Sequence, residues 1–360
     1  MLERSKALTT ASDLFGELDS LIALAMAAEK YKWTAPKMAT TNTIDIKEGR
    51  HPLQELVVPS FIANPCRLSG GQDTHEDEDE DMQLPPSHQL EEDQDDNQPG
   101  PSMLSLTGPN HSGKSVYLKQ VALIVYLAHV GSYVPANRAT IGLTDKILTR
   151  ISTRESMARS ESAFAIDLRQ AAFSINHTTR RSLILIDEFG KGTNVTDGAG
   201  LITALLDHFL HLASKSPKVL VATHFHEIFE HSFLTAEDRL SFAHMEVRLD
   251  LQTEEQVTYL FRLIEGRSTS SYGCRCAAMN GVDSAVVDRA EALALMLARN
   301  EDLQAACAKL APAEEKRLEE AEGVARRFLE MDVPIVSGRG GTGDVRRMLG
   351  FLLGEGSVAS

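Results

Sequence analysis

Short, nearly continuous apolar runs alternate with stretches of helical periodicity through the middle of the chain. A strand buried on both faces carries such a run, and parallel strands packed between helices are buried in that way. The pattern predicts an α/β fold with a mainly parallel, doubly wound sheet. The runs are Met103–Leu106, Leu183–Ile186 and Val219–Ala222, and the helical stretches cover 115–130, 162–177 and 197–213.

Helical periodicity also marks the start of the chain. Within residues 1–32 an apolar side chain recurs every four positions, and Ser12 or Asp13 is the expected N-cap. Pro36 is expected to end this helix, because proline cannot continue it. A short strand is expected at 43–46, and a strand and turn are expected within VVPSFIANPCRL at 57–68. The recurring apolar residues are Leu14, Leu18, Ile22 and Met26.

The pattern changes twice after residue 240. Residues 242–265 alternate between apolar and polar side chains, which is typical of antiparallel edge strands. From 267 onward, SYGCRCAAMNG and VDSAVVDRAEAL predict a helix–turn–helix, and a later helix is expected over 312–331. We expect the helix–turn–helix to serve packing or dimer contact rather than DNA reading, because its second helix is mainly acidic. The composition of 337–344 is that of a flexible linker.

The negative charge of the chain is concentrated in one segment. The formal net charge is −15, and residues 74–98 hold eleven acidic and no basic side chains, which leaves −4 for the rest. This segment has no apolar period and is expected to be a solvated, disordered insertion, with an acidic docking tail as the functional alternative. A chain with this balance is not coated with the basic patches that bind nucleic acid.

Cysteine usage and hydropathy indicate an intracellular protein. The four cysteines, Cys66, Cys274, Cys276 and Cys307, form no C-x-x-C pair, which is typical of a reducing compartment. No apolar run reaches transmembrane length, and the N-terminus lacks the apolar core of a signal peptide. We therefore expect a soluble protein with no membrane association.

The sequence LSLTGPNHSGKS at 104–115 fits the phosphate-binding pattern G-x-x-x-x-G-K-[ST]. It stands between an apolar run and a helical pattern, which is the context that this motif requires. Backbone N–H groups of such a loop surround phosphate oxygens, and the following helix start favours an anion. Lys114 would reach the outer phosphates, and the Ser115 hydroxyl would hold Mg²⁺. The structural alternative is a Gly/Ser/Pro turn before an ordinary helix.

Two further apolar runs end in polar side chains. LILIDEFGKGT at 183–193 delivers Asp187 and Glu188, a pair that would hold Mg²⁺ through water and polarise the attacking water. VATHFHEIF at 221–229 delivers His224 to the same sheet edge, where it would face the γ-phosphate. A carboxylate pair in a turn and a structural histidine are the ordinary alternatives. The phosphate loop earlier in the chain favours the catalytic roles of Glu188 and His224.

These residues belong to a longer series of motifs, and the chain resembles the ATPase domain of the MutS DNA-mismatch-repair family over about residues 8–295. Generic P-loop proteins do not carry this series in this order. The variants GKSVYLKQ and DEFGKGT, with the closing EEAEGVARRFLEMDV, are most similar to the meiotic branch, the fifth eukaryotic MutS homologues. The motifs are EGRHPLQE, FIANP, TGPNHSGKSVYLKQ, VGSYVPA, LILIDEFGKGTNVTDG, ATHFHE and SYG.

The resemblance implies an ABC-like P-loop ATPase with ATP and Mg²⁺ as cofactors. Phe61 in FIANP would stack on adenine with Ile62 beside it, and Asn110 would contact the γ-phosphate region. Ser115 and Asp187 would be the metal ligands. The nucleotide-binding set is completed by the loop residues Gly108, Pro109, His111, Ser112, Gly113, Lys114, Ser115 and Val116.

The resemblance also implies a partner subunit. Ser162 would be inserted against the γ-phosphate of that partner, and Asn194 and Asp197 would belong to a loop that crosses between subunits. The helices from Ser271 onward would clasp the partner ATPase domain. The chain departs from the family where Ser112 replaces a usual glycine, where His111 is unusual, and where Ala163 replaces a usual threonine.

The family's mismatch-binding, connector, clamp and most lever segments have no counterpart in the sequence. We therefore expect a fragment, a truncated gene product or a reduced homologue, with weak DNA contact of its own. The expected domains are a lever-helix remnant at 1–36, an ATPase domain at 37–266 with an acidic insertion at 69–101, a helix–turn–helix dimerisation segment at 267–300 and a helical tail at 301–360.

Taken together, the sequence predicts an ATP-binding and hydrolysing MutS-type protein that acts on DNA mismatches or recombination intermediates. It would work on chromosomes in the nucleus as a heterodimer with another MutS homologue, the fourth. A scaffold that binds ATP with little hydrolysis is the alternative, and intact Lys114, Asp187 and Glu188 weigh against it. An ABC- or recombinase-type ATPase would need an LSGGQ-like signature or DNA-binding loops after the phosphate loop, and the sequence has neither there.

Overall fold

The computed structural model of the chain describes residues 2–72, 100–151, 162–225, 234, 238–249, 257–268, 272–299 and 312–330. It contains two compact units, Met1–Gly281 and Val282–Ser360, and their boundary falls inside the segment 267–300. The acidic segment 74–98, Ser271 and the linker at 337–344 lie outside the described residues, so the expectations for them stay predictions.

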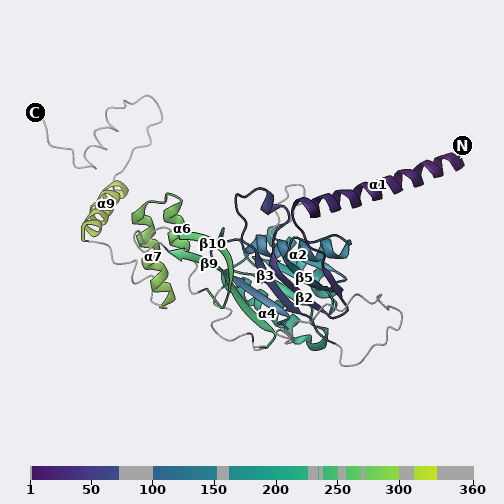
Figure 1. The fold of residues 1–360 in the computed structure, drawn as a ribbon. Coiled ribbons are helices and arrows are strands. Elements are labelled where there is room, and N and C mark those ends of the chain that lie inside the picture. The colour runs from purple at the N-terminus through teal and green to yellow at the C-terminus, as the bar shows by residue number, and fades with distance from the viewer. Residues whose placement is uncertain are drawn as a thin grey trace, which may run out of the picture. The chain divides into compact units, whose positions relative to one another are not determined.

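A six-stranded sheet organises the first unit (Figure 1). Its order is β10-β9-β4-β8-β7-β6, and every neighbouring pair from β9 to β6 is parallel. The three predicted apolar runs form β4, β7 and β8, which confirms an α/β fold with parallel strands. The strands are β4 (Met103–Thr107), β6 (Ile147–Arg150), β7 (Leu183–Asp187), β8 (Lys218–Ala222), β9 (Leu240–Leu249) and β10 (Val257–Glu265).

The stretch predicted to form two edge strands gives β9 and β10. Their antiparallel pairing is confirmed, with a register shift between Tyr259 and Leu263. The edge prediction is wrong for β9, because β9 also pairs in parallel with β4. Alternation reports which faces of a strand are buried, and it carries no information about how many hydrogen-bonded neighbours the strand has.

Alternate residues of the central strands enter two separate cores, one on each face of the sheet. Leu104 and Leu106 of β4 share one core with α2 (Lys114–His129). Met103 of β4 shares the other core with α4 (Val195–His211). The remaining helix of this layer, α3 (Ala163–His177), contacts β6 and adds Ala171 to the second core. The helices expected at 115–130, 162–177 and 197–213 are therefore confirmed.

A second sheet of four strands, in the order β1-β5-β2-β3, packs on the α2 side. Its residues Ile44, Leu68 and Ile141 are fully buried in the same core as α2. The strand at 43–46 was predicted from the sequence, as were a strand and turn within 57–68, where β3 begins. The sheet itself was not predicted. The strands are β1 (Lys37–Ala39), β2 (Thr43–Gly49), β3 (Asn64–Ser69) and β5 (Arg138–Gly142), and a short 3-10 helix, η1 (Gln54–Leu56), follows β2.

The first helix, α1 (Leu2–Lys30), ends close to its predicted end. The predicted cap is wrong, since Ser12 and Asp13 lie inside the helix. The residues before Ser12 include good helix formers and no helix breaker, so the helix begins upstream of Ser12 and not at it. The apolar series is exposed, from 48% at Ile22 to 64% at Met26. No described helix is both long and apolar enough to cross a membrane.

The remaining helices come after α4 in the sequence. Another short 3-10 helix, η2 (Ala213–Lys215), precedes β8, and α6 (Gly273–Met279) closes the first unit. The second unit contains α7 (Ser284–Ala298), capped by Asp283, and α9 (Pro312–Glu330). Helices therefore occur where they were expected, while the packing of α6 and α7 as a helix–turn–helix stays a prediction.

Candidate functional site

The phosphate-loop sequence connects β4 to α2 through backbone that glycine adopts most easily. Gly108 and Gly113 have φ angles of 132° and 103°, a region that residues with a Cβ rarely occupy. Gly113 is also the N-cap of α2, a 16-residue helix. The loop thus ends at the amino terminus of a long helix, a position that favours an anion.

Lys114 is 4% exposed. Its Nζ donates hydrogen bonds to the carbonyl oxygens of Gly108 at 2.7 Å and Pro109 at 2.9 Å. Burial lowers the pKa of Lys114 to about 8, against the opposing effect of the carboxylates Glu188 and Asp187. An ammonium held only by neutral carbonyls gains strongly from an anionic partner, because charge-assisted hydrogen bonds are the stronger kind.

Two buried oxygens near this loop have no hydrogen-bond partner among the described residues. They are Ser112 Oγ and Asp187 Oδ1, in residues that are 1% and 3% exposed. Buried polar atoms normally have a partner, so both are suited to a ligand. Ser112 would donate to a phosphate oxygen, and Asp187 with the Ser115 hydroxyl would supply oxygen ligands to Mg²⁺.

The described residues contain no cluster of three or more His, Cys, Asp or Glu side chains that could hold a metal ion. Mg²⁺ bound by Ser115 and Asp187 would therefore depend on phosphate oxygens and water for its other ligands, as is usual for this ion. The residues present thus fit a magnesium nucleotide better than a free divalent cation.

Glu188 and His224 meet at the carboxyl ends of β7 and β8, as the apolar runs predicted. His224 Nε2 lies 2.6 Å from Glu188 Oε1, and Lys191 Nζ lies 2.5 Å from Glu188 Oε2. The hydrogen bond from His224, followed by Lys191, lowers the pKa of Glu188 to about 2 against the raising effect of burial. The carboxylate therefore stays ionised at any physiological pH. Lys191 is half exposed, so its ion pair is of the weak surface kind.

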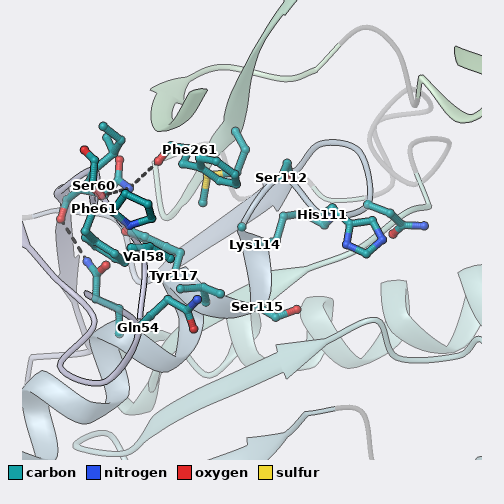
Figure 2. Close-up of a pocket in the computed structure, with 18 of the residues that line it drawn as sticks. Gln54, Val58, Ser60, Phe61, His111, Ser112, Lys114, Ser115, Tyr117 and Phe261 are labelled. Carbon is teal, nitrogen blue, oxygen red and sulfur yellow. Dashed lines mark hydrogen bonds between the residues drawn. The ribbon is translucent and has the colours of Figure 1, made fainter. Parts of the chain in front are cut away.

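A cavity of about 580 Å³ opens in front of the phosphate loop (Figure 2). Its size is that of a small-molecule site. The loop residues Asn110 to Val116 line it, as do Glu188 and the segment 58–62 with Phe61 and Ile62. In Figure 2, Phe61 lies on one side, and His111 and Ser115 lie on the other. Most residues predicted to bind nucleotide thus border one space, although they come from distant parts of the chain.

Phe261 also lines this cavity, and sequence reasoning missed it. It lies in the irregular stretch of β10 with a φ of 54° and is 46% exposed. The buried Asn64 holds this stretch, because its Nδ2 donates to Phe261 O at 2.9 Å and its Oδ1 accepts from Leu263 N at 2.7 Å. The alternation of 257–263 predicted a strand, and no sequence signal marked the irregularity that turns Phe261 toward the cavity.

The three residues predicted to contact a partner do not line the cavity. Ser162 and Asn194 are the N-caps of α3 and α4, where their side chains accept hydrogen bonds from Ala165 N and Thr196 N, both at 3.2 Å. Both are exposed, as is Asp197. Capping accounts for what Ser162 and Asn194 contact within this chain, and their role in a partner site stays a prediction.

A family model described as MutS domain V matches residues 104–298, which include the phosphate loop, Asp187, Glu188 and His224. MutS protein homolog 5 of Saccharomyces cerevisiae is 33% identical over 353 residues, which cover 93% of this chain and 37% of the relative.

Bacterial relatives are similar over a somewhat shorter range. DNA mismatch repair protein MutS of Salinibacter ruber is 38% identical over 283 residues, 78% of this chain and 27% of the relative. The protein of the same name in Lachnoclostridium phytofermentans is 32% identical over 301 residues, 83% of this chain and 29% of the relative. The chain thus spans between 27% and 37% of the length of these curated relatives.

Proposed function

This chain belongs to the MutS family, and we propose that it binds and hydrolyses ATP with Mg²⁺ in the cavity beside the phosphate loop. The observation that carries the proposal is the convergence of Lys114, Asp187 and Glu188 at one edge of the six-stranded sheet. Lys114 and Glu188 line the same cavity, and Asp187 precedes Glu188 as the last residue of β7. A cation, a metal ligand and a water-polarising carboxylate are the parts that phosphoryl transfer from ATP to water requires.

Nucleotide binding would use both walls of the cavity. Phe61 and Ile62 would hold the adenine on one side, and Phe261 would approach from the other, since aromatic faces stack well on bases. Lys114 would exchange its two loop carbonyls for phosphate oxygens, and Ser112 would add a neutral donor. Once Lys114 has made this exchange, its ammonium and the Ser112 hydroxyl would already face the phosphates when negative charge develops.

Hydrolysis would depend on Glu188 and His224. Glu188 is ionised and would accept a hydrogen bond from the attacking water, while His224 keeps its carboxylate in position. A carboxylate with a pKa of about 2 is a weak base, so Glu188 would orient and polarise the water rather than remove its proton early. Ser115 and Asp187 would hold Mg²⁺, which would supply positive charge to neutralise the phosphates.

A second MutS homologue is part of the same proposal. Ser162, Asn194 and Asp197 would meet the partner's nucleotide, and the helices after residue 271 would hold the two ATPase domains together. ATP and the closed dimer would then favour each other by one shared free energy. The 33% identity to MutS protein homolog 5 supports a meiotic role on nuclear chromosomes, with the fourth homologue as partner. Action on mismatched or recombining DNA is part of the same proposal.

The proposal is tested by titrating the chain with ATP in the presence of Mg²⁺ or EDTA and by following phosphate release. We expect tight binding only with Mg²⁺, and slow phosphate release that rises with protein concentration or with added partner. A chain that is folded by circular dichroism and binds no ATP would overturn the proposal. Binding without any phosphate release, even with partner, would favour the ATP-binding scaffold instead.

A further inference from the structure

The last residue of β6 is a buried arginine that the proposed mechanism does not use. Arg150 is 6% exposed, and Asp167 on α3 is 4% exposed. Arg150 Nη2 donates to Asp167 Oδ2, and Nη1 donates to the carbonyl oxygen of Asp187. The guanidinium also lies over the ring of Phe189, 6.0 Å from its centroid. This one side chain therefore joins the end of β6, the helix α3 and the end of β7.

The peptide unit between Asp187 and Glu188 is held from both sides. Its carbonyl oxygen accepts from Arg150, and its N–H donates to the carbonyl oxygen of Ala222 at 2.9 Å. The orientation of this unit determines the φ of Glu188, which is 55°. Residues with a Cβ rarely adopt such a φ, and they keep it only where the surroundings impose it. Arg150 and Ala222 hold the peptide unit that precedes this residue.

We propose that Arg150 is a positioning residue for ATP hydrolysis, which fixes the 187–188 peptide and thereby places Asp187 and Glu188 at the phosphate loop. Through Asp167 it also ties both carboxylates to α3, the helix that begins after Ser162. The inference rests on the proposed function and adds a residue to it. A buried ion pair gives little net stability compared with an apolar replacement, so geometry is the better reason for its presence.

The first test is Arg150→Lys, which keeps the charge and cannot hold both acceptors as the guanidinium does. The single-turnover rate of ATP hydrolysis should fall about tenfold or more, since small displacements of a catalytic group are costly. Nucleotide affinity measured without divalent metal should change less than about twofold, because Lys114 and Phe61 are untouched. Asp167→Asn should give a smaller loss in the same direction. Arg138→Lys, at an exposed site on β5, is the matched control.

A double-mutant cycle separates positioning from general destabilisation. If Arg150 acts through Glu188, then Arg150→Lys should slow hydrolysis in the wild-type background and cause little further loss in Glu188→Gln. A second readout needs no turnover: Mn²⁺ affinity of the ADP-bound chain, measured by electron paramagnetic resonance. This Mn²⁺ affinity should weaken several-fold in Arg150→Lys, since Asp187 belongs to the 187–188 peptide unit that Arg150 holds.

The outcomes distinguish this inference from the function on which it rests. If Glu188→Gln slows hydrolysis while folded Arg150→Lys hydrolyses ATP at the wild-type rate, the positioning role is overturned alone. Losses that multiply in the double mutant would also overturn it. A wild-type chain that fails to bind or hydrolyse ATP would overturn the proposed function instead. Should Arg150→Lys fold poorly, Asp167→Asn carries the same cycle and the same readouts.

Discussion

Two lysines in the six-stranded sheet region are almost completely buried at opposite ends of neighbouring strands. Lys114 follows the carboxyl end of β4 and is 4% exposed, whereas Lys218 begins β8 and is 0% exposed. Burial lowers the pKa of both to about 8. The same desolvation thus acts on both side chains, and only their surroundings differ.

Lys218 is enclosed by protein partners. Its Nζ donates to Asn42 Oδ1 and, at 3.3 Å, to the carbonyl oxygen of Arg181. Asn42 in turn donates to the carbonyl oxygens of Gly71 and Arg180. None of these residues lines the cavity, whereas Lys114 does. A buried cation surrounded by fixed acceptors stabilises the fold, and one that borders a cavity can exchange its acceptors for a ligand.

The largest change in ATP hydrolysis is expected at the carboxyl ends of the strands, beside the cavity. Glu188→Gln removes a charge and keeps the shape, so ATP binding should persist while hydrolysis slows by about a hundredfold or more. Phosphate release under single-turnover conditions measures this. Asp145→Asn is the matched carboxylate at the opposite edge, where Thr179 and Ser182 donate to it at 2.7 Å and 3.1 Å. Asp145→Asn should hydrolyse ATP at the wild-type rate. Equal losses of hydrolysis in Glu188→Gln and Asp145→Asn would mean that the two ends of the sheet do not differ in function.

The next effect is on stability. Lys218→Met leaves Asn42 Oδ1 and the Arg181 carbonyl without their donor, and should lower the free energy of unfolding by about 1–3 kcal/mol. ATP affinity should not change, because the nucleotide site is at the other end of the sheet. Urea denaturation and an ATP titration of the same preparation check both. Unchanged stability with weakened ATP binding would mean that the two ends of the sheet are not separate in function.

The two lysines also show which features could be predicted from the sequence. Lys114 was predicted because its neighbours form a phosphate-binding pattern between a strand and a helix. Lys218 gave no signal, because Asn42 and Arg181 lie far from it in the sequence and a lysine before an apolar run usually marks a solvated strand end. Its burial follows from the four-stranded sheet, which was not predicted.

The residues near the phosphate loop that were predicted, and those that were missed, differ for the same reason: contacts between distant segments leave no local sequence signal. Asp187, Glu188 and His224 were predicted to share one end of the sheet, because parallel strands have their carboxyl ends on the same side. Phe261 and Arg150 were not, since the first depends on an irregular strand held by Asn64 and the second on a contact across two strands and a helix. The wrong cap at Ser12 shows the complementary limit, because a capping residue marks a helix start only where no helix former precedes it.

A smaller effect is expected when a partner is present. Ser162→Ala should slow hydrolysis about tenfold at the partner's nucleotide and leave its own site unaffected, as for one lost transition-state donor. Mixing the variant with a hydrolysis-deficient Glu188→Gln chain or a partner homologue, and counting turnovers per active site, locates the defect. A defect at the variant's own ATP would contradict a role across the subunit boundary.

The smallest effect is a pH dependence. Lys114 has a lowered pKa of about 8, so above that pH it is mostly neutral and must take up a proton to pair with phosphate. ATP affinity should therefore fall about fivefold between pH 8 and pH 9, which a calorimetric titration can follow. Lys114→Arg should show no such fall, since arginine does not titrate there. A flat profile for the wild-type chain up to pH 9.5 would mean that Lys114 is not the titrating phosphate ligand.

The most direct test of the account is the dissociation constant for Mg²⁺-ATP in two matched variants, Lys114→Met and Lys218→Met. Both replace a buried ammonium by an apolar side chain of similar length. Lys114 lies beside the cavity, and Lys218 lies among the fixed acceptors of Asn42 and Arg181. Lys114→Met should weaken ATP binding about a hundredfold or more, while Lys218→Met should bind ATP like the wild-type chain. Wild-type affinity in a folded Lys114→Met chain, or equal losses in the two variants, would contradict it.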